Sequence, residues 1–210
     1  MRPWIIAIAA FLIGTGVGAA PVEPVPSDAT KVIPLAVGAA MPAVTVRNPD
    51  GSSRLLGPGP LAKPMIIIFY RGGWCPYCNR HLGAIKKVEP DLLALGYDLL
   101  FLSSDRPSIL YSSLKEPDIR YTLLSDSTMA AARAYRVAFH LDAAAMAEYR
   151  GYGVDLEATT GEKHHQLPVP AVFVIDRAGV IRFVHANPDI TTRLSPADLL
   201  SAAQAVAAKH

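Results

Sequence analysis

Two cysteines constrain this chain more than any other feature, because the sequence contains no others. They lie three residues apart in the segment WCPYC, as Cys75 and Cys78. The continuous apolar run MIIIFY precedes them and is typical of a strand buried on both faces of a sheet. A helical pattern follows from Pro76, with large apolar side chains at spacings of three and four. The pair is therefore predicted at the turn from a buried strand into a helix N-terminus.

This placement predicts redox chemistry at the two sulfurs. In a C-x-x-C at a helix N-terminus the sulfurs can approach bonding distance. The unpaired N–H groups and the helix dipole there favour the thiolate of the first cysteine. Pro76 suits the first helical position, where no N–H is needed. We therefore expect Cys75 to be an exposed nucleophile with a lowered pKa, and Cys78 to be the shielded resolving thiol.

Two other interpretations of the pair are open. One is a purely structural disulfide, but it closes a loop too short to stabilise the fold much. The other is a metal site built from the two cysteines and His81, with His164 and His165 as further ligands, but no second paired cluster typical of zinc modules is present in the sequence. A haem attachment site needs histidine at position 79, which is Asn79. We predict no metal, and no cofactor apart from a redox-active disulfide.

The pattern along the chain predicts one α/β domain, a sheet covered by helices on both faces. Ser195 is the expected N-cap of the last helix, with Pro196 at its first position. The expected elements are a hairpin around residues 48–51, strands at 65–70, 97–103, 121–124, 171–176 and 180–185, and helices at 76–95, 129–136, 142–149 and 196–208.

The first twenty residues have the pattern of a secretory signal peptide. Arg2 supplies the positive start, an apolar stretch follows, and Val17-Gly18-Ala19 fits the small-residue cleavage rule. An uncleaved anchor is the alternative, since the apolar stretch reaches about 17 residues, near the lower limit for a membrane span. The predicted organisation is a signal peptide over 1–19, a Pro-rich linker over 20–37 and a folded domain over 38–210. We expect an exported, periplasmic or extracytoplasmic protein in an oxidising space.

Five segments in order resemble the peroxiredoxin-like branch of the alkyl hydroperoxide reductase/thiol-specific antioxidant (AhpC/TSA) family, within the thioredoxin-like superfamily. They are VGAAMPAVTVRNPDG, FYRGGWCPYC, YDLLFLSSD, YTLLSDSTMAAARAYRV and VPAVFVIDRAGVIRFVH. The resemblance covers about residues 38–208. It implies a thioredoxin-like fold with a central mixed β-sheet, helices on both faces and an N-terminal hairpin extension.

The sequence departs from this family at the peroxide pocket. Classical peroxiredoxins have threonine or serine three residues before the peroxidatic cysteine and proline seven before it, and here these positions are Gly72 and Ile68. The segment WCPYC resembles the thioredoxin pair instead, and its central dipeptide is found in glutaredoxins. The buried acid of thioredoxins would fall within residues 66–68, where none is present. Proton transfer then needs another group or water, and His164 and His165 are candidates, with a solvated loop pair as the alternative.

Other side chains are expected to support the pair. The resemblance places the superfamily's cis-proline on Pro170, next to Cys75 in space. Arg71 can hold a substrate oxyanion or lower the pKa of Cys75 further, and a solvated rim residue is the alternative. Trp74 and Tyr70 are expected to pack in the core and at the rim of the site.

The primary hypothesis is dithiol–disulfide exchange. The Cys75 thiolate attacks a disulfide or a hydroperoxide, Cys78 resolves the product, and an external thiol reductant protein resets the resulting disulfide. We therefore predict an antioxidant thiol-disulfide oxidoreductase that reduces disulfides, hydroperoxides or both, and we favour disulfides because the residues of the peroxide pocket are missing. The alternative is a non-catalytic exported binding module with a static disulfide, which would use residues 139–168, a stretch long for a loop, as its recognition element.

The charge pattern bears on the partners. The net charge of +2 comes from 20 basic and 18 acidic residues, and no run of five like charges occurs. This balance argues against nucleic acid as a partner. Contact with a membrane is expected only through the signal peptide if it is not cleaved.

Overall fold

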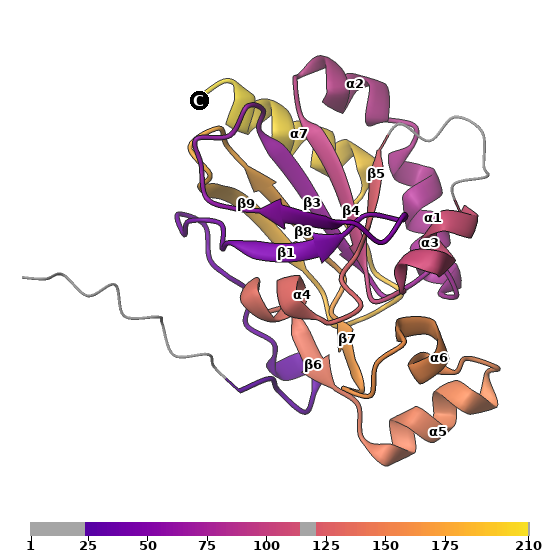
Figure 1. The fold of residues 1–210 in the computed structure, drawn as a ribbon. Helices are drawn as coiled ribbons and strands as arrows, with labels where there is room; N and C mark the ends of the chain where they lie inside the picture. The colour runs from indigo at the N-terminus through magenta and orange to yellow at the C-terminus, as the bar shows by residue number, and fades with distance from the viewer. Residues whose placement is uncertain (1–23, 114–120, 210) are drawn as a thin grey trace, which may run out of the picture.

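The computed structural model describes residues 24–113 and 121–209 (Figure 1). The predicted signal peptide, residues 1–19, lies outside these described residues. Within them, no helix combines the length and the apolar character that crossing a membrane requires.

A seven-stranded mixed sheet forms the centre of the fold, in the order β2-β1-β5-β4-β3-β8-β9. Strands β3, β4 and β5 are parallel, whereas β8 is antiparallel to β3 and β9 to β8. At the other edge β1 and β2 form the predicted N-terminal hairpin. The strands are β1 (Val44–Arg47), β2 (Ser53–Leu56), β3 (Met65–Tyr70), β4 (Asp98–Ser103), β5 (Thr122–Ser125), β6 (Ala138–His140), β7 (Gln166–Pro168), β8 (Ala171–Ile175) and β9 (Ile181–Ala186).

Helices cover both faces of this sheet, as the pattern predicted. Along β3, Ile66 and Ile68 pack with α1, α2 and α7 on one face, while Ile67 and Phe69 pack with α4 on the other. Burial on both sides explains why this strand is apolar without alternation. The helices are the short 3-10 helix η1 (Ala29–Lys31), then α1 (Pro76–Ile85), α2 (Glu89–Ala94), α3 (Pro107–Ser113), α4 (Ala130–Ala134), α5 (Ala143–Gly151), α6 (Leu156–Thr160) and α7 (Pro196–Ala207).

The predicted single helix over residues 76–95 is wrong, because the chain forms α1 and α2 with a break between them. Pro90 lies in the first turn of α2, where a missing N–H is tolerated. Inside one long helix the same proline would remove a backbone hydrogen bond and clash with the preceding turn. The last helix was predicted correctly: Ser195 Oγ accepts a hydrogen bond from Asp198 N at 3.1 Å, and Pro196 begins α7.

A small lobe lies below the main sheet in Figure 1, built from β6, β7, α5 and α6. Strands β6 and β7 pair with each other rather than with the main sheet. Helix α5 was expected, and Asp142 caps it by accepting from Ala145 N at 2.8 Å. We expected an irregular loop after this helix, and that expectation is wrong, since α6 and β7 occupy the stretch. Met146, Leu156 and Leu167 form the lobe's own apolar cluster.

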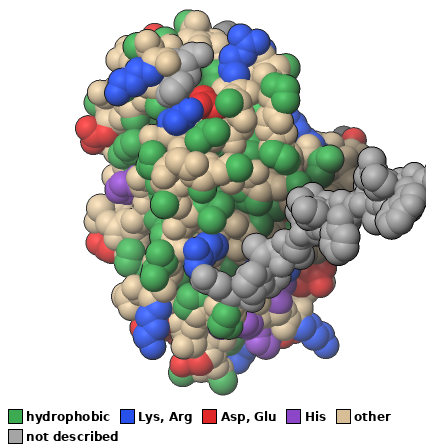
Figure 2. Space-filling view, turned by 90° about the vertical axis from the view of Figure 1, so that its left-hand side faces the viewer, with side chains coloured by type: hydrophobic (Ala, Val, Ile, Leu, Met, Phe, Trp, Pro, Cys, Tyr) green, Lys and Arg blue, Asp and Glu red, His purple; other side chains and the backbone are tan. Residues whose placement is uncertain are grey.

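The proline-rich segment before Gly38 runs along the folded domain where the structure describes it. His140 N donates to Pro26 O at 2.7 Å, and Leu35 N donates to Tyr135 O at 3.1 Å. Val25 and Leu35 also pack against the core. On the face drawn in Figure 2, Lys and Arg side chains stand apart among apolar and polar ones and do not merge into one basic surface.

Candidate active site

The two cysteines lie at the turn from β3 into α1. Cys75 is the N-cap of the helix, Pro76 occupies its first turn, and Cys78 follows within that turn. Both are free thiols. The expected exposure of Cys75 is wrong, because only 1% of the residue is accessible and Cys78 is fully buried. Arg71, Trp74 and Tyr149 line the same hollow as Cys75, and no periodicity in the sequence predicts which distant residues surround it.

The surroundings separate the pKa values of the two thiols. A hydrogen bond from the Cys78 side chain lowers the pKa of Cys75 to about 6 against the opposing effect of burial. A hydrogen bond from the Cys78 backbone and then the charges of Arg71 and Arg193 contribute in the same direction. The same hydrogen bond, together with burial, raises the pKa of Cys78. One sulfur is therefore set up as a thiolate near neutral pH, while the other holds its proton.

Arg71 is enclosed rather than solvated at the rim. Only 3% of it is exposed, and its guanidinium carbon lies 4.9 Å from the centre of the Trp74 ring and 5.1 Å from that of Tyr149. The two rings meet edge to face at 5.5 Å. Its Nε is buried and has no hydrogen-bond partner. The stack joins α5 of the small lobe to the cysteine loop and keeps a cation beside Cys75.

Polar side chains that follow β4 hold the loop before Cys75. Ser104 Oγ donates to Arg71 O at 2.7 Å, and Gly73 N donates to Asp105 Oδ2 at 2.7 Å. Burial raises the pKa of Asp105 to about 6. We did not predict these residues, although the SSD ending of YDLLFLSSD was a signal. Parallel strands β3 and β4 are neighbours, so the residues that follow their carboxyl ends meet at one edge of the sheet.

A second arginine, also not predicted, reaches the site from the segment between β9 and α7. Arg193 Nη2 lies 3.8 Å from Cys78 Sγ. His81 and His185 lie close enough for its charge to lower their pKa values, after the larger effect of burial. Arg193 is 115 residues from Cys78 in the chain, and no local pattern connects the two positions.

A hollow of about 630 Å³ opens beside Cys75. The cysteine loop forms one side with Trp74 and Cys75, and the small lobe forms the other with residues including Phe139, Tyr149 and Tyr152. Its size falls within the range of small-molecule sites, and its lining is largely aromatic and aliphatic. The stretch 139–168 thus contributes a wall of the site.

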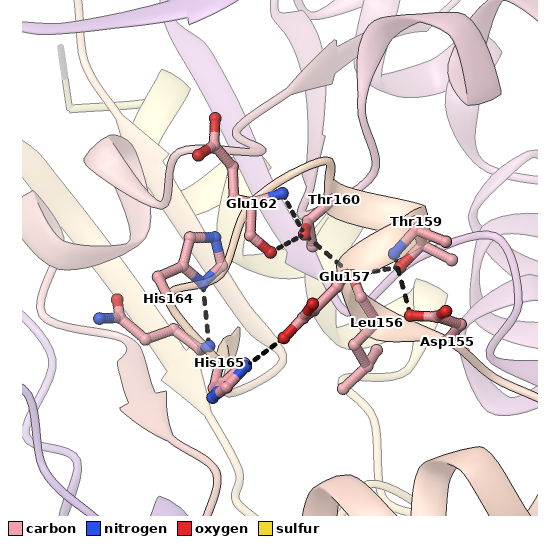
Figure 3. A network of polar contacts seen from close by, with 10 residues as sticks. Asp155, Leu156, Glu157, Thr159, Thr160, Glu162, His164 and His165 are labelled. Atoms are coloured by element: carbon pink, nitrogen blue, oxygen red, sulfur yellow. Dashed lines mark hydrogen bonds and ion pairs between the residues drawn. The ribbon is translucent and has the colours of Figure 1, made fainter.

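His164 and His165 do not line this hollow, so the structure does not support them as proton acceptors for the cysteines. Figure 3 shows them in a separate polar network with α6. His164 Nε2 lies 2.7 Å from Ser127 O, and His165 Nε2 lies 2.7 Å from Glu157 Oε1. Their ring nitrogens hold the start of β7 against neighbouring segments.

Pro170 also differs from the expectation. Within the described ranges, the only cis peptide bond is Gly59–Pro60, so the Val169–Pro170 bond is trans. Val169 N donates to Val137 O at 2.8 Å, and Asn187 N donates to Pro170 O at 3.2 Å. The residue therefore links the small lobe to the main sheet and does not line the hollow beside Cys75.

The sheet order and the cysteine pair at the start of α1 define a thioredoxin-fold protein with a two-cysteine motif. The chain belongs to the AhpC/TSA family, whose sequence model matches residues 37–184. It is a peroxiredoxin-like member of that family.

Curated relatives agree with this placement. The chain is 24% identical over 150 residues to the chloroplastic peroxiredoxin Q of Populus jackii, a match covering 71% of this chain and 60% of that protein. It is 25% identical over 167 residues to the chloroplastic peroxiredoxin Q of Suaeda salsa, covering 80% of this chain and 67% of that protein. The match therefore spans less than two thirds of the Populus protein.

Solved structures agree on the fold. Peroxidoxin BcpB from Mycobacterium tuberculosis superposes with a TM-score of 0.60 at 17% identity, over 81% of this chain and 97% of that one. The reduced 2-Cys peroxiredoxin of Plasmodium vivax gives 0.61 at 19% identity, over 82% of each chain.

Proposed function

We propose that this protein is a thiol-dependent peroxidase that uses Cys75 and Cys78 as a redox pair. The Cys75 thiolate attacks an oxygen of the hydroperoxide, the O–O bond breaks, and a sulfenic acid forms. The alkoxide or hydroxide that leaves takes up a proton from solvent and becomes an alcohol or water. The Cys78 thiol then condenses with the sulfenic acid, releases water and forms the Cys75–Cys78 disulfide. An external thiol reductant protein restores both thiols.

The observation that carries this proposal is that the pKa values of two thiols at the start of one helix are shifted in opposite directions. The pKa of Cys75 is lowered to about 6, which supplies a nucleophile at neutral pH, while that of Cys78 is raised. The buried cation of Arg71 beside Cys75 supports the charge that develops on the peroxide oxygen. Membership of the AhpC/TSA family and the peroxiredoxin relatives support peroxide as the substrate.

A second candidate is reduction of protein disulfides by the same two sulfurs, which the C-P-Y-C spacing favours. In this dithiol form Cys75 is only 1% exposed, which favours a hydroperoxide because it is smaller than a disulfide in a folded protein.

Two assays on the reduced domain, residues 20–210, separate these functions. We expect consumption of hydrogen peroxide or an organic hydroperoxide to exceed reduction of a model protein disulfide, and Cys75→Ser to abolish both. Fast disulfide reduction with slow peroxide turnover would assign a thioredoxin-type reductase instead. Full physiological activity in Cys75→Ser would favour a binding module that uses the small lobe.

We also propose that residues 1–19 direct export and that the mature protein acts in an extracytoplasmic, oxidising space. An N-terminal sequence of the mature protein beginning near Ala20, obtained from the periplasmic fraction of an expressing bacterium, would support this. An intact N-terminus in the cytosolic fraction would contradict it.

A further inference from the structure

We propose that Arg193 is a catalytic residue, which stabilises the thiolate of Cys78 when this sulfur attacks Cys75 or leaves it. Its Nη2 lies 3.8 Å from Cys78 Sγ, so it contacts a reacting atom directly. The inference rests on the proposed function and adds to it Arg193, which lies outside the cysteine motif and does not line the hollow.

The guanidinium is held in place by its own segment. Nη1 donates to Thr192 O at 2.9 Å and to Asp189 O at 3.5 Å, which leaves Nη2 directed at the sulfur. These partners are backbone carbonyls, so the arginine contributes little to the core. A substitution here changes the site with little expected effect on folding.

The largest influences on Cys78 favour its thiol form, because its hydrogen bond to Cys75 and its burial raise its pKa. A backbone hydrogen bond from Arg71 and the charge of Arg193 act in the opposite direction, and Arg193 is the one of these two that acts through a side chain. The strand before the motif carries no acid in residues 66–68 to take the proton. A buried thiolate is costly without a partner of opposite charge, and arginine stays protonated at every relevant pH.

The histidines and carboxylates near Arg193 supply no positive charge to Cys78. Burial lowers the pKa of His81 to about 4 and also lowers that of His185, so both are neutral near pH 7. Asp189 accepts from Thr191 and Thr192, and Asp198 accepts from Ser195. Arg71 is the other cation near the pair, and its charge interacts with both sulfurs.

Cys78 carries negative charge in two steps of the cycle, when it resolves the product at Cys75 and when it leaves during reduction of the disulfide. In resolution, Cys78 loses its proton and its thiolate attacks the sulfur of the Cys75 sulfenic acid, from which hydroxide leaves and takes up a proton to become water. When Cys75 carries a mixed disulfide instead, the bound thiol leaves as a thiolate. In reset, a thiolate of the external reductant attacks the Cys75 sulfur, the Cys75–Cys78 bond breaks, and Cys78 leaves with the electron pair. Arg193 faces the negative charge on Cys78 in each case.

Stopped-flow reaction of the reduced protein with Ellman's reagent, DTNB, tests the proposal. The first release of thionitrobenzoate reports attack by Cys75, and the second reports resolution by Cys78, so Cys78→Ser should abolish only the second. We expect Arg193→Gln to slow the second phase about tenfold, the effect of a shift of about one pKa unit in a neighbouring thiol. It should also move the pH midpoint of that phase upward, and the first phase should stay within about threefold of the wild type.

Two further variants keep the proposal falsifiable. Arg193→Lys retains the charge and should restore the second phase to within about threefold of the wild type. Arg47→Gln removes the same charge from an exposed position on β1 and should leave both phases unchanged. A second phase that is unaffected in Arg193→Gln, or equally slow in Arg193→Lys, would overturn the role of this arginine. A wild-type protein that consumes no hydroperoxide would instead refute the proposed function.

Discussion

Replacing Cys78 with alanine should raise the pKa of Cys75, because the hydrogen bond from Cys78 is the largest contribution that lowers it. Hydrogen bonds to charged groups are worth about 1.5–3 kcal/mol, which corresponds to roughly one to two pKa units. The midpoint of Cys75 should therefore move from about 6 to roughly 7–8 in Cys78→Ala. At neutral pH the thiolate fraction would fall from roughly 90% to about half or less.

Two measurements follow this titration. Thiolate absorbance at about 240 nm counts the ionised sulfur directly, and the pH dependence of alkylation by iodoacetamide gives the same midpoint kinetically. Gly83→Ala is the matched control, since it lies on the same helix and its new Cβ meets nothing within 4 Å. A midpoint above about 8 in the wild type, or an unchanged midpoint in Cys78→Ala, would refute the view that the second thiol activates the first.

Two other perturbations test the loop and the core. A Cβ at Gly72 would collide with Trp74 Nε1 and lie 2.8 Å from Asp105 Oδ1, so Gly72→Ala should cost about 1–3 kcal/mol in urea unfolding. Gly73→Ala is the control, because its nearest such contact is 3.8 Å away, and equal losses would contradict the argument. Burial raises the pKa of Asp126 to about 7, so the folded state binds its proton more tightly than the unfolded state, and the free energy of unfolding falls as pH rises towards about 7. Between about pH 5 and about pH 8 this fall should be roughly 2–3 kcal/mol larger in the wild type than in Asp126→Asn. The free energy of unfolding is measured with urea at each pH, and an equal fall in the two proteins would show that Asp126 does not titrate in this range.

The local part of the site could be predicted because its signals are local. The run MIIIFY is apolar throughout because β3 packs on both faces, and Pro76 marks the start of α1. Ser195 and Pro196 mark the start of α7 in the same way. In each case the structural requirement falls on a few consecutive residues, so one short segment of sequence is enough to predict the element.

What could not be predicted depends on contacts between distant segments. Arg193 reaches Cys78 because the segment after β9 returns across the start of α1, and Tyr149 covers Arg71 because α5 lies against the cysteine loop. The predicted roles of His164 and His165 failed for a related reason: nearness to Pro170 along the chain does not place their rings in the hollow.

Residues that follow the neighbouring strand β4 hold the loop where this chain lacks the hydroxyl side chain of a classical peroxiredoxin pocket. The position of the family's threonine or serine is Gly72, which brings no hydroxyl to the site. Ser104 and Asp105 after β4 instead hold the backbone on either side of Gly72, through Arg71 O and Gly73 N. A side chain at position 72 would displace both Trp74 and Asp105. The glycine at position 72 therefore leaves room for the buried Asp105 carboxyl, which helps to hold the cysteine loop. The positive charge near the two sulfurs comes from Arg71 and Arg193.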